Sequence, residues 1–437
     1  MYSKYICGME NMEELYRLYL SSKGICTDSR KLEVGQLFFA LRGENFDGND
    51  FAEIALENGA IAVVIDDPEK IALRNFYYVP DALTALQQLA QFHRKHFQIP
   101  VIAITGSNGK TTTKELISSV LSGKYRIKAT SGNLNNHIGV PLTLLSIQAD
   151  TEFAIIEMGA NHLGEITFLC EIVQPDYGLI TNIGKAHLEG FGNLEGVIRA
   201  KTELYKFLAL SNGLAFVNGK DELLLTKSSN LRRILYNSDS SAVKGDIVDT
   251  TGYLKVSLRI LNRDYLLHTQ LVGAYNLPNI LAAACIGNYF GVEDDKICEA
   301  IKNYRPSNFR SQFIKTQHNK LVMDAYNANP SSMEAAITNF VSRFESPKAA
   351  ILGEMLELGL ESKKEHQAIV DKIASANIQK LFFVGKNFSD IALPPTAMHF
   401  ENATLLKDYL RKEPLQQYFI LIKGSRGNKL ETLLDVL

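Results

Sequence analysis

The residues most clearly suited to chemistry lie in a glycine-rich run at positions 105–112, with the sequence TGSNGKTT. Glycines at such a turn let backbone N–H groups converge on phosphate oxygens, and a helix that begins there adds the positive end of its dipole. Lys110 can neutralise the β- and γ-phosphates, and the Thr111 hydroxyl can ligate Mg²⁺. Only two residues separate Gly106 from Gly109, fewer than in the usual G-x-x-x-x-G-K-[ST] loop.

The surroundings of this run favour a phosphate loop over a tight turn with an incidental lysine. An apolar, strand-like segment at 99–105 leads into it, and a helix-like pattern at 113–122 follows. A phosphate loop alone does not name a reaction, because kinases, hydrolases and ligases all use one. We expect a nucleotide triphosphate to contact the whole run: Gly106, Ser107, Asn108, Gly109, Lys110, Thr111 and Thr112.

Two further strand ends carry groups that suit a magnesium–phosphate site. Glu157 ends the apolar segment 153–157, where a second Mg²⁺ ligand is expected beside a phosphate loop. His187 follows the next such segment, 177–182. Taken singly, Glu157 is equally a solvated carboxylate and His187 a structural histidine. Three consecutive strand ends with such groups favour the functional interpretation.

Alternating strand and helix patterns indicate how these residues are positioned. Short apolar segments recur between longer helix-like ones, which predicts parallel sheets with helices on both faces. Residues 246–272 instead alternate apolar and polar positions and predict an antiparallel hairpin edge. We therefore predict an α/β protein of three domains: a small N-terminal α/β domain (1–97), a central, mostly parallel P-loop domain (98–312) and a C-terminal Rossmann-like α/β domain (313–437).

Composition narrows the class of protein further. The 437 residues exceed what one hydrophobic core usually organises. The 46 basic and 48 acidic residues give a formal charge of -2, without the global footprint of a nucleic-acid binder. Five cysteines without a C-x-x-C pair suit a reducing compartment. The charged first twenty residues and the lack of long apolar runs lead us to expect a cytoplasmic protein without membrane insertion.

Longer stretches of the chain match a known family: GSNGKTTTKE, EMGANHLGEI, TNIGKAHLEGFG and AKTEL. Together they resemble the Mur ligase family, the ATP-dependent amide-forming enzymes of peptidoglycan precursor synthesis. The resemblance extends over nearly the whole chain. The family's uridine-nucleotide-binding domain is matched by TDSRKLEVGQLFFALRGENFDGNDF, and its adenine-contacting segment is matched by GAYNLPNILAA. One branch of the family joins D-Ala-D-Ala to UDP-N-acetylmuramoyl-tripeptide. This chain resembles that branch in the segments MDAYNANPSSM, LGEMLELG and KGSRG. The DNPR-type signature expected of the tripeptide-forming branch does not occur.

The resemblance implies a ligase that uses ATP and two Mg²⁺ ions. Family members activate a substrate carboxylate as an acyl phosphate, and an incoming amine then displaces phosphate. The implied substrates are UDP-MurNAc-tripeptide and D-Ala-D-Ala, the implied products the pentapeptide, ADP and phosphate, and the implied state a monomer. The implied catalytic residues are Lys110, His187, Lys201 and Arg310.

The same resemblance assigns the magnesium ligands. Thr111 and Glu157 match the first magnesium site, and His187 matches the second. Lys201 matches a lysine that several family members carbamylate, which turns an ammonium that repels Mg²⁺ into a carboxylate that can hold it. The alternative for Lys201 is a helix-surface lysine paired with a nearby acid such as Glu203 or Glu195.

The nucleotide contacts beyond the loop also follow from the resemblance. Asn276 and Asn279 match the adenine-side asparagines, although Asn279 is equally suited to capping a helix. Arg310 matches an arginine at the domain joint that reaches the γ-phosphate, and Asp324 matches an acid that meets the ribose.

The resemblance also implies thirteen residues that contact the two peptide substrates. Taken singly, the asparagines and glycines among them could be turn residues. Arg426 or Lys423 is expected to pair with the carboxylate of the dipeptide. The uridine diphosphate site is expected at Thr27, Ser29, Arg30, Gly43, Asn45 and Asp47, the muramoyl-peptide side at Asn135 and Asn136, and the dipeptide site at Tyr326, Asn327, Asn329, Lys423 and Arg426.

The chain departs from the family pattern at two positions. Glu354 stands where this branch often has Asp, and Asn49 stands where a His often follows the Asp-Gly pair. Two other functions remain as alternatives: a ligase of the same superfamily that adds a single amino acid, and a P-loop ATPase or regulatory nucleotide-binding protein. The uridine-type domain and DAYNANP argue against the first, and the intact catalytic positions argue against the second.

Overall fold

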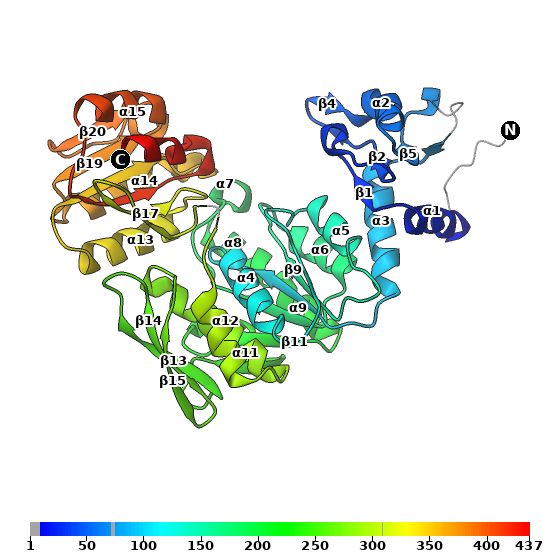
Figure 1. The fold of residues 1–437 in the computed structure, drawn as a ribbon, viewed down its shortest axis with the longest axis horizontal. Coiled ribbons are helices and arrows are strands. Elements are labelled where there is room, and N and C mark those ends of the chain that lie inside the picture. Colours follow the sequence, from blue (N-terminus) through cyan, green and yellow to red (C-terminus); the bar gives the residue numbers. More distant parts are fainter. Residues whose placement is uncertain (1–8, 71–74, 308) are drawn as a thin grey trace. The chain divides into compact units, whose positions relative to one another are not determined.

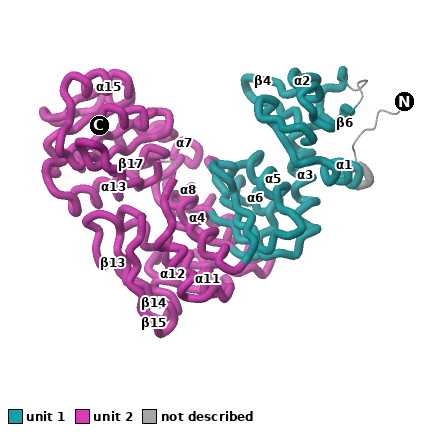
Figure 2. The backbone as a smooth tube through the Cα atoms, in the orientation of Figure 1, with its two compact units in different colours: residues 1–104, 125–160, 165–177 teal, residues 105–124, 161–164, 178–437 magenta. Residues whose placement is uncertain are grey.

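The computed structural model describes residues 9–70, 75–307 and 309–437. Helices and strands alternate along most of the chain (Figure 1). Two compact units make up the chain (Figure 2), one of residues 1–104, 125–160 and 165–177, the other of residues 105–124, 161–164 and 178–437. The predicted α/β class with parallel sheets is confirmed.

A four-stranded parallel sheet lies in the N-terminal part of the first unit, in the order β1-β2-β5-β6. Its two inner strands carry only apolar residues and are fully buried, as expected when helices or loops cover both faces. The strands are β1 (Ile25–Cys26), β2 (Leu37–Phe39), β5 (Ala62–Ile65) and β6 (Phe76–Tyr78), with a hairpin of β3 (Arg42–Gly43) and β4 (Phe46–Asp47) after β2. The helices are α1 (Met9–Ser21), α2 (Ala52–Glu57) and α3 (Ala82–Lys95).

Helix α3 organises the first unit. The Asp81 side chain caps its N-terminus by accepting a hydrogen bond from the backbone N–H of Thr84 at 2.6 Å. Its apolar side packs against α1 and against α5 (Gly139–Leu144) and α6 (Glu165–Val173). Helix α3 therefore contacts both the N-terminal sheet, through β2, and the helices α5 and α6.

A six-stranded sheet has the order β12-β11-β10-β7-β9-β8. Strands β7 and β9 run parallel and are apolar until their last residues, Thr105 and Glu157, so polar groups appear at their carboxyl ends. The strands are β7 (Val101–Thr105), β8 (Ile127–Ala129), β9 (Phe153–Glu157), β10 (Tyr177–Ile180), β11 (Leu214–Asn218) and β12 (Arg232–Tyr236). The helices of this region are α4 (Lys110–Leu121), α7 (Leu188–Phe191), α8 (Leu194–Lys201), α9 (Glu203–Leu210), α10 (Glu222–Lys227), α11 (Leu277–Tyr289) and α12 (Asp294–Asn303), together with α5 and α6.

The second unit contains two more sheets. Residues expected to form a hairpin edge instead form an antiparallel sheet of their own, with β13 (Val243–Asp249), β14 (Lys255–Ile260) and β15 (Arg263–His268). The C-terminal sheet has the order β16-β17-β21-β18-β19-β20, and only its edge strand β16 is antiparallel. Its elements are β16 (Gln312–Lys315), β17 (Lys320–Asp324), α13 (Pro330–Arg343), β18 (Lys348–Gly353), α14 (Ser362–Ala374), β19 (Lys380–Val384), β20 (Ala397–Phe400), α15 (Ala403–Lys412) and β21 (Phe419–Lys423).

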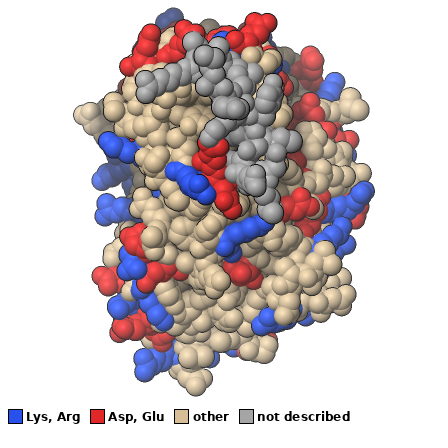
Figure 3. Space-filling view, turned by 90° about the vertical axis from the view of Figure 1, so that its right-hand side faces the viewer, with Lys and Arg blue, Asp and Glu red and all other residues tan. Residues whose placement is uncertain are grey.

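Three features relate to the composition: the distribution of surface charge, the polarity of the helices and the state of the cysteines. On the face drawn in Figure 3, acidic and basic side chains are interspersed. Among the residues that the structure describes, every helix is too short or too polar to cross a bilayer. Four cysteines of the described residues are buried and form no disulfide, and Cys7 lies outside the described residues.

Candidate active site

The glycine-rich run forms a tight turn between β7 and α4. Gly106 has a φ of 140°, and a Cβ atom there would lie 2.1 Å from Thr181 Oγ1. Gly109 has a φ of 78°, and its Cβ would lie 2.9 Å from Asn279 Oδ1. Both positions therefore require glycine, for conformation and for space. Helix α4 begins at Lys110, earlier than predicted, so Gly109 is its N-cap and Lys110 and Thr111 lie in its first turn, where backbone N–H groups lack partners within the helix.

The loop after β10 holds this turn in place. Asn182 pairs with Asn108 in both directions: its Oδ1 accepts from the Asn108 N–H at 3.1 Å, and its Nδ2 donates to the Asn108 carbonyl at 3.0 Å. The Thr181 hydroxyl donates to the same carbonyl at 2.6 Å. The Ser107 hydroxyl bonds to the backbone of Gly184 through both its O–H and its oxygen. These contacts fix the backbone of the predicted phosphate loop.

Lys110, Asn276 just before α11 and Asn279 in its first turn complete the immediate surroundings of the loop. The Lys110 ammonium donates to the Gly106 carbonyl at 2.6 Å, so the side chain folds over the turn. Asn276 donates from Nδ2 to Val272 O, and Asn279 donates to Asn276 Oδ1 at 3.0 Å. Asn279 thus packs beside Gly109 and does not cap the helix.

His187 is held by a carboxylate from the C-terminal part of the second unit. It has a φ of 51° at the start of α7, and its Nδ1 contacts Glu357 Oε2. This hydrogen bond lowers the pKa of the Glu357 carboxyl. In the tautomer that donates from Nδ1, the Nε2 atom keeps its lone pair, as is usual for a metal-binding histidine with a carboxylate behind it.

Lys201, at the end of α8, is 1% exposed, and its ammonium lies 5.3 Å from the centroid of the Phe191 ring. It is therefore a buried residue, not the helix-surface lysine of the alternative interpretation. Burial disfavours a charged ammonium, and such a lysine changes its protonation or chemistry more readily than an exposed one.

Arg310 and the segment 324–329 lie together. The Arg310 Cζ atom is 3.6 Å from the centroid of the Tyr326 ring, and Nε is buried without a hydrogen-bond partner in the described structure. Lys423, 1% exposed, donates to Asp324 Oδ2 at 2.7 Å and to Asn327 O at 3.2 Å. Lys423 is thereby engaged within the domain, whereas Arg426 is exposed.

Asn329 contacts the phosphate loop. Its Oδ1 caps α13 by accepting from the Ser332 N–H at 2.9 Å, and its Nδ2 donates to Asn108 Oδ1 at 2.9 Å. A residue predicted for the dipeptide site therefore lies against the nucleotide loop. Lys185, in the loop after β10, adds an ion pair with Glu365 at 2.6 Å and a backbone hydrogen bond to Ser331 Oγ.

The first unit holds Glu157 and the two asparagines of the expected muramoyl-peptide loop. Glu157 is 2% exposed; its Oε1 accepts from Asn135 Nδ2 at 2.8 Å, and its backbone N–H donates to Thr130 Oγ1. Asn136 is exposed, and its Oδ1 accepts from the N–H of Gly139 at the start of α5. Asn135 therefore orients a buried carboxylate, whereas Asn136 supports a helix terminus.

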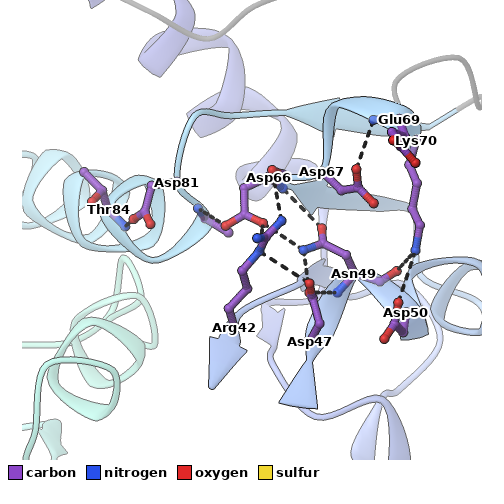
Figure 4. A network of polar contacts seen from close by, with 11 residues as sticks. Arg42, Asp47, Asn49, Asp50, Asp66, Asp67, Glu69, Lys70, Asp81 and Thr84 are labelled. Carbon is purple, nitrogen blue, oxygen red and sulfur yellow. Dashed lines mark hydrogen bonds and ion pairs between the residues drawn. The ribbon is translucent and has the colours of Figure 1, made fainter. Parts of the chain in front are cut away.

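A network of polar side chains, which we call the N-terminal network, consists of Arg42, Asp47, Asn49, Asp66 and Lys70 (Figure 4). Asn49, 1% exposed, donates from Nδ2 to Asp47 Oδ1 and to Asp66 Oδ1, both at 2.7 Å. Arg42 donates to Asp66 at 2.8 Å, and Lys70 donates to the Asn49 carbonyl at 2.6 Å. The departure at Asn49 thus fills a buried position that joins the β3–β4 hairpin to β5.

The remaining residues of the expected uridine site lie nearer the surface. Arg30 is exposed and donates two hydrogen bonds to Asp28, at 2.8 and 2.9 Å. These bonds hold the pKa of Asp28 at about 2. Gly43 and Asn45 are exposed on the β3–β4 hairpin, and Thr27 and Ser29 are half-buried.

Comparison with known proteins decides the family. Domain models match residues 21–94 (Mur ligase family, catalytic domain), 104–287 (Mur ligase middle domain) and 309–426 (Mur ligase, glutamate ligase domain). A UDP-N-acetylmuramoyl-tripeptide–D-alanyl-D-alanine ligase of Bacillus subtilis (strain 168) is 36% identical over 428 residues, 94% of this chain and 92% of the relative. The chain belongs to the Mur ligase family. The resemblance drawn from its motifs is confirmed.

Solved structures agree with this Mur ligase in fold. The crystal structure of MurF from Acinetobacter baumannii is 30% identical, with a TM-score of 0.86 and coverage of 97% of both chains. MurF ligase from Thermotoga maritima in complex with ADP is 25% identical, with a TM-score of 0.85, covering 95% of this chain and 97% of that one.

Several residues that contact the predicted site of this Mur ligase have no role predicted from the sequence. Glu357 contacts His187, Glu365 pairs with Lys185, and Thr181 contacts the phosphate loop. Glu357 lies in LGEMLELG, which carried part of the resemblance, but nothing in that motif indicated a partner 170 residues away. For the other two, no local pattern distinguishes them from surface or strand-end residues.

Proposed function

We propose that the protein is an ATP-dependent ligase that joins D-Ala-D-Ala to UDP-N-acetylmuramoyl-tripeptide and releases ADP and phosphate. The observation that carries this proposal is the glycine-dependent phosphate loop, in a chain 36% identical over nearly its full length to a ligase of that name. The proposed reaction passes through an acyl phosphate of the tripeptide carboxyl group, which the amine of the dipeptide then attacks.

The residues around the loop suit the transfer of a phosphoryl group. The first turn of α4 and Lys110 stabilise negative charge on the β- and γ-phosphates, and Arg310 does the same for the γ-phosphate. Asn276 and Asn279 supply amides for adenine, and Asp324 supplies a carboxylate for the ribose. The incoming α-amine has a pKa near ~8, so a useful fraction is neutral without a dedicated base, and we assign none.

The donor set fits magnesium bound to a nucleotide. Within the described ranges, no group of three or more His, Cys, Asp or Glu side chains forms a ready metal site. Mg²⁺ commonly takes one or two protein ligands and completes its shell with phosphates and water, which suits Thr111, Glu157 and His187. When bound, it would neutralise the phosphates and the charge that develops on the transferred group. A carbamylated Lys201 would add a carboxylate.

The proposed contacts of the peptide substrates follow the family. Thr27, Ser29, Arg30, Gly43, Asn45 and Asp47 would meet the uridine nucleotide, and Asn135 and Asn136 the muramoyl peptide. Tyr326, Asn327, Asn329, Lys423 and Arg426 would surround the dipeptide. The exposed guanidinium of Arg426 is better placed than the engaged Lys423 to pair with a carboxylate. We further propose a cytoplasmic monomer, in keeping with four buried cysteines that form no disulfide within the described residues.

Mass spectrometry of the reaction product tests the proposal. With UDP-MurNAc-tripeptide, D-Ala-D-Ala, ATP and Mg²⁺, the expected product is the UDP-MurNAc-pentapeptide, with one phosphate released per peptide formed. Lys110→Ala should abolish the product, and Lys227→Ala, an exposed lysine on α10, should leave it unchanged. Faster phosphate release with a single amino acid would favour the other amide ligase. Release that needs neither acceptor nor nucleotide-linked peptide would favour a plain ATPase.

A further inference from the structure

The Tyr326 ring contacts two guanidinium groups of the second unit. The Arg310 Cζ atom lies 3.6 Å from the ring centroid and the Arg426 Cζ atom 5.4 Å. A cation within about 6 Å of an aromatic centroid is attracted by the electron density of the ring face. One ring therefore contacts both arginines that are proposed to meet anions, the γ-phosphate at Arg310 and the dipeptide carboxylate at Arg426.

The main chain brings Arg310 and Tyr326 together. The Ala325 N–H donates to the Phe309 carbonyl at 3.0 Å, which continues the antiparallel pairing of β16 and β17. Arg310 lies between Phe309 and Ser311, whose φ values are 55° and 48°. Such left-handed residues cost energy and persist where the surrounding structure determines them. The backbone on both sides of Arg310 therefore holds this residue in a fixed position just before β16.

Contacts on both sides of Tyr326 fix the ring. The buried Lys423 ammonium binds Asp324 on one side and the Asn327 carbonyl on the other. Asn329, two residues further on, is held by its cap on α13 and by Asn108. The segment that presents the ring therefore has few alternative conformations.

The ring face, and not the hydroxyl, makes these contacts. The Tyr326 hydroxyl forms no hydrogen bond within the described part of the chain, although neighbouring polar groups do. Arg310 Nε is buried and has no hydrogen-bond acceptor among the residues that the structure describes. A guanidinium stacked on an aromatic ring keeps its outer N–H groups available for a phosphate.

We propose that Tyr326 is a positioning residue whose ring holds Arg310 for the γ-phosphate of ATP and Arg426 for the carboxylate of the dipeptide. This inference rests on the proposed function. Two guanidinium groups on one ring repel each other, and an anion bound to either one reduces that repulsion. The ring thereby couples the site of the phosphate to the site of the incoming amine.

Steady-state kinetics of Tyr326→Phe and Tyr326→Leu in the full-length protein test the proposal. Tyr326→Leu should raise the KM values for ATP and for D-Ala-D-Ala, each by about 5-fold to 30-fold, because the cation–π contacts are lost. Tyr326→Phe keeps the ring face and should restore wild-type KM values. Tyr289→Leu, an aromatic exchange on α11, controls for the general effect of removing a ring.

A double-mutant cycle with Arg310→Ala separates positioning from mere stability. If Tyr326 acts through Arg310, Tyr326→Leu should add little to the ATP defect of Arg310→Ala. Fully additive defects, or a Tyr326→Phe variant as impaired as Tyr326→Leu, would overturn the proposal. Thermal unfolding of each variant identifies losses due to misfolding, and a calorimetric Kd for a non-hydrolysable ATP analogue then gives the answer without turnover. The wild-type product assay tests the proposed function separately.

Discussion

The phosphate loop of the second unit and the N-terminal network of the first unit both present polar groups to proposed nucleotide substrates, but they are built differently. In the phosphate loop, two glycines and the start of α4 shape the backbone, and Asn182 holds it. In the N-terminal network, side chains from positions 42 to 70 bind one another around Asn49 (Figure 4).

This difference governs how each region responds to substitution. A backbone turn whose glycines have no room for a Cβ has no substitute conformation of similar energy. A side-chain network with several hydrogen bonds loses only part of its free energy when one member is changed. The phosphate loop should therefore fail completely, whereas the N-terminal network should weaken by degrees.

The largest effect is expected for Gly106→Ala. The new Cβ would collide with the Thr181 side chain, and the backbone would have to leave its φ of 140°. A displacement of about 1 Å in a catalytic site costs roughly 100-fold in rate, so kcat/KM should fall by at least that factor. Gly291→Ala, where the φ is 69° and the nearest atom is the end of the flexible Lys124 side chain, should strain the fold but spare kcat/KM. Equal losses in both variants would remove the distinction between the two regions.

An intermediate effect is expected for Glu357→Gln, because it alters one side chain behind His187. The neutral amide should hold the imidazole less firmly, and the Mg²⁺ concentration for half-maximal activity should rise by about 10-fold. Titration of activity with Mg²⁺ measures it. Glu361→Gln, which removes the exposed acid paired with Lys364, is the matched control and should not change the Mg²⁺ requirement. An unchanged requirement in Glu357→Gln would mean that this carboxylate serves only to join the domains.

A smaller, graded effect is expected for Asn49→Ala. Asp47 and Asp66 each lose a hydrogen bond, and the free energy of unfolding should fall by about 1–3 kcal/mol. The KM for UDP-MurNAc-tripeptide should rise several-fold, whereas the KM for ATP should stay unchanged, in contrast to the glycine variant. Asn49→His, which restores the residue often found in relatives, should recover part of the loss. A rise in the KM for ATP would contradict the separate action of the two regions.

The smallest expected effect is on the free energy of unfolding and comes from two buried thiols on helices that pack against α4. Burial raises the pKa of Cys285 to about 12 and that of Cys298 to about 11, and their helices α11 and α12 pack against α4. The unfolded thiols ionise near pH ~8.5 while the folded ones remain protonated, so stability should fall as the pH rises, by roughly 1–2 kcal/mol per thiol between pH 8 and 10. Urea unfolding at both pH values measures this loss. A Cys285→Ala/Cys298→Ala variant should lose less stability over the same range; an identical loss would assign the effect to other groups.

Local features of the molecule could be predicted from the sequence. The strand ending at Thr105, the glycine turn and the following helix are adjacent in the chain, and apolar runs marked the buried strands. The sequence pattern predicts a helix from residue 113, three residues after the start of α4 at Lys110, because the residues before it are typical of a glycine-rich loop. The pattern at 246–272 predicts only a hairpin edge and not the three-stranded sheet of β13, β14 and β15, because only part of this region alternates clearly.

Long-range contacts could not be predicted. His187 and Glu357 are 170 residues apart, and Asn329 and Asn108 are 221 apart. Such pairs depend on tertiary packing, which leaves no periodic or compositional trace in either segment. The roles assigned to the site residues on the basis of the family therefore stay predictions, although the structure gives several of them unexpected partners, as at Lys423.

Asn329 uses the two ends of one amide for two separate tasks. Its oxygen completes the cap of α13, and its nitrogen binds the side chain of Asn108. An aspartate has nearly the same shape and would keep the oxygen, but it has no donor and would bring a negative charge toward the triphosphate. A change of a single atom type at this position would thus keep the helix cap while removing one of the contacts between the C-terminal part of the second unit and the phosphate loop.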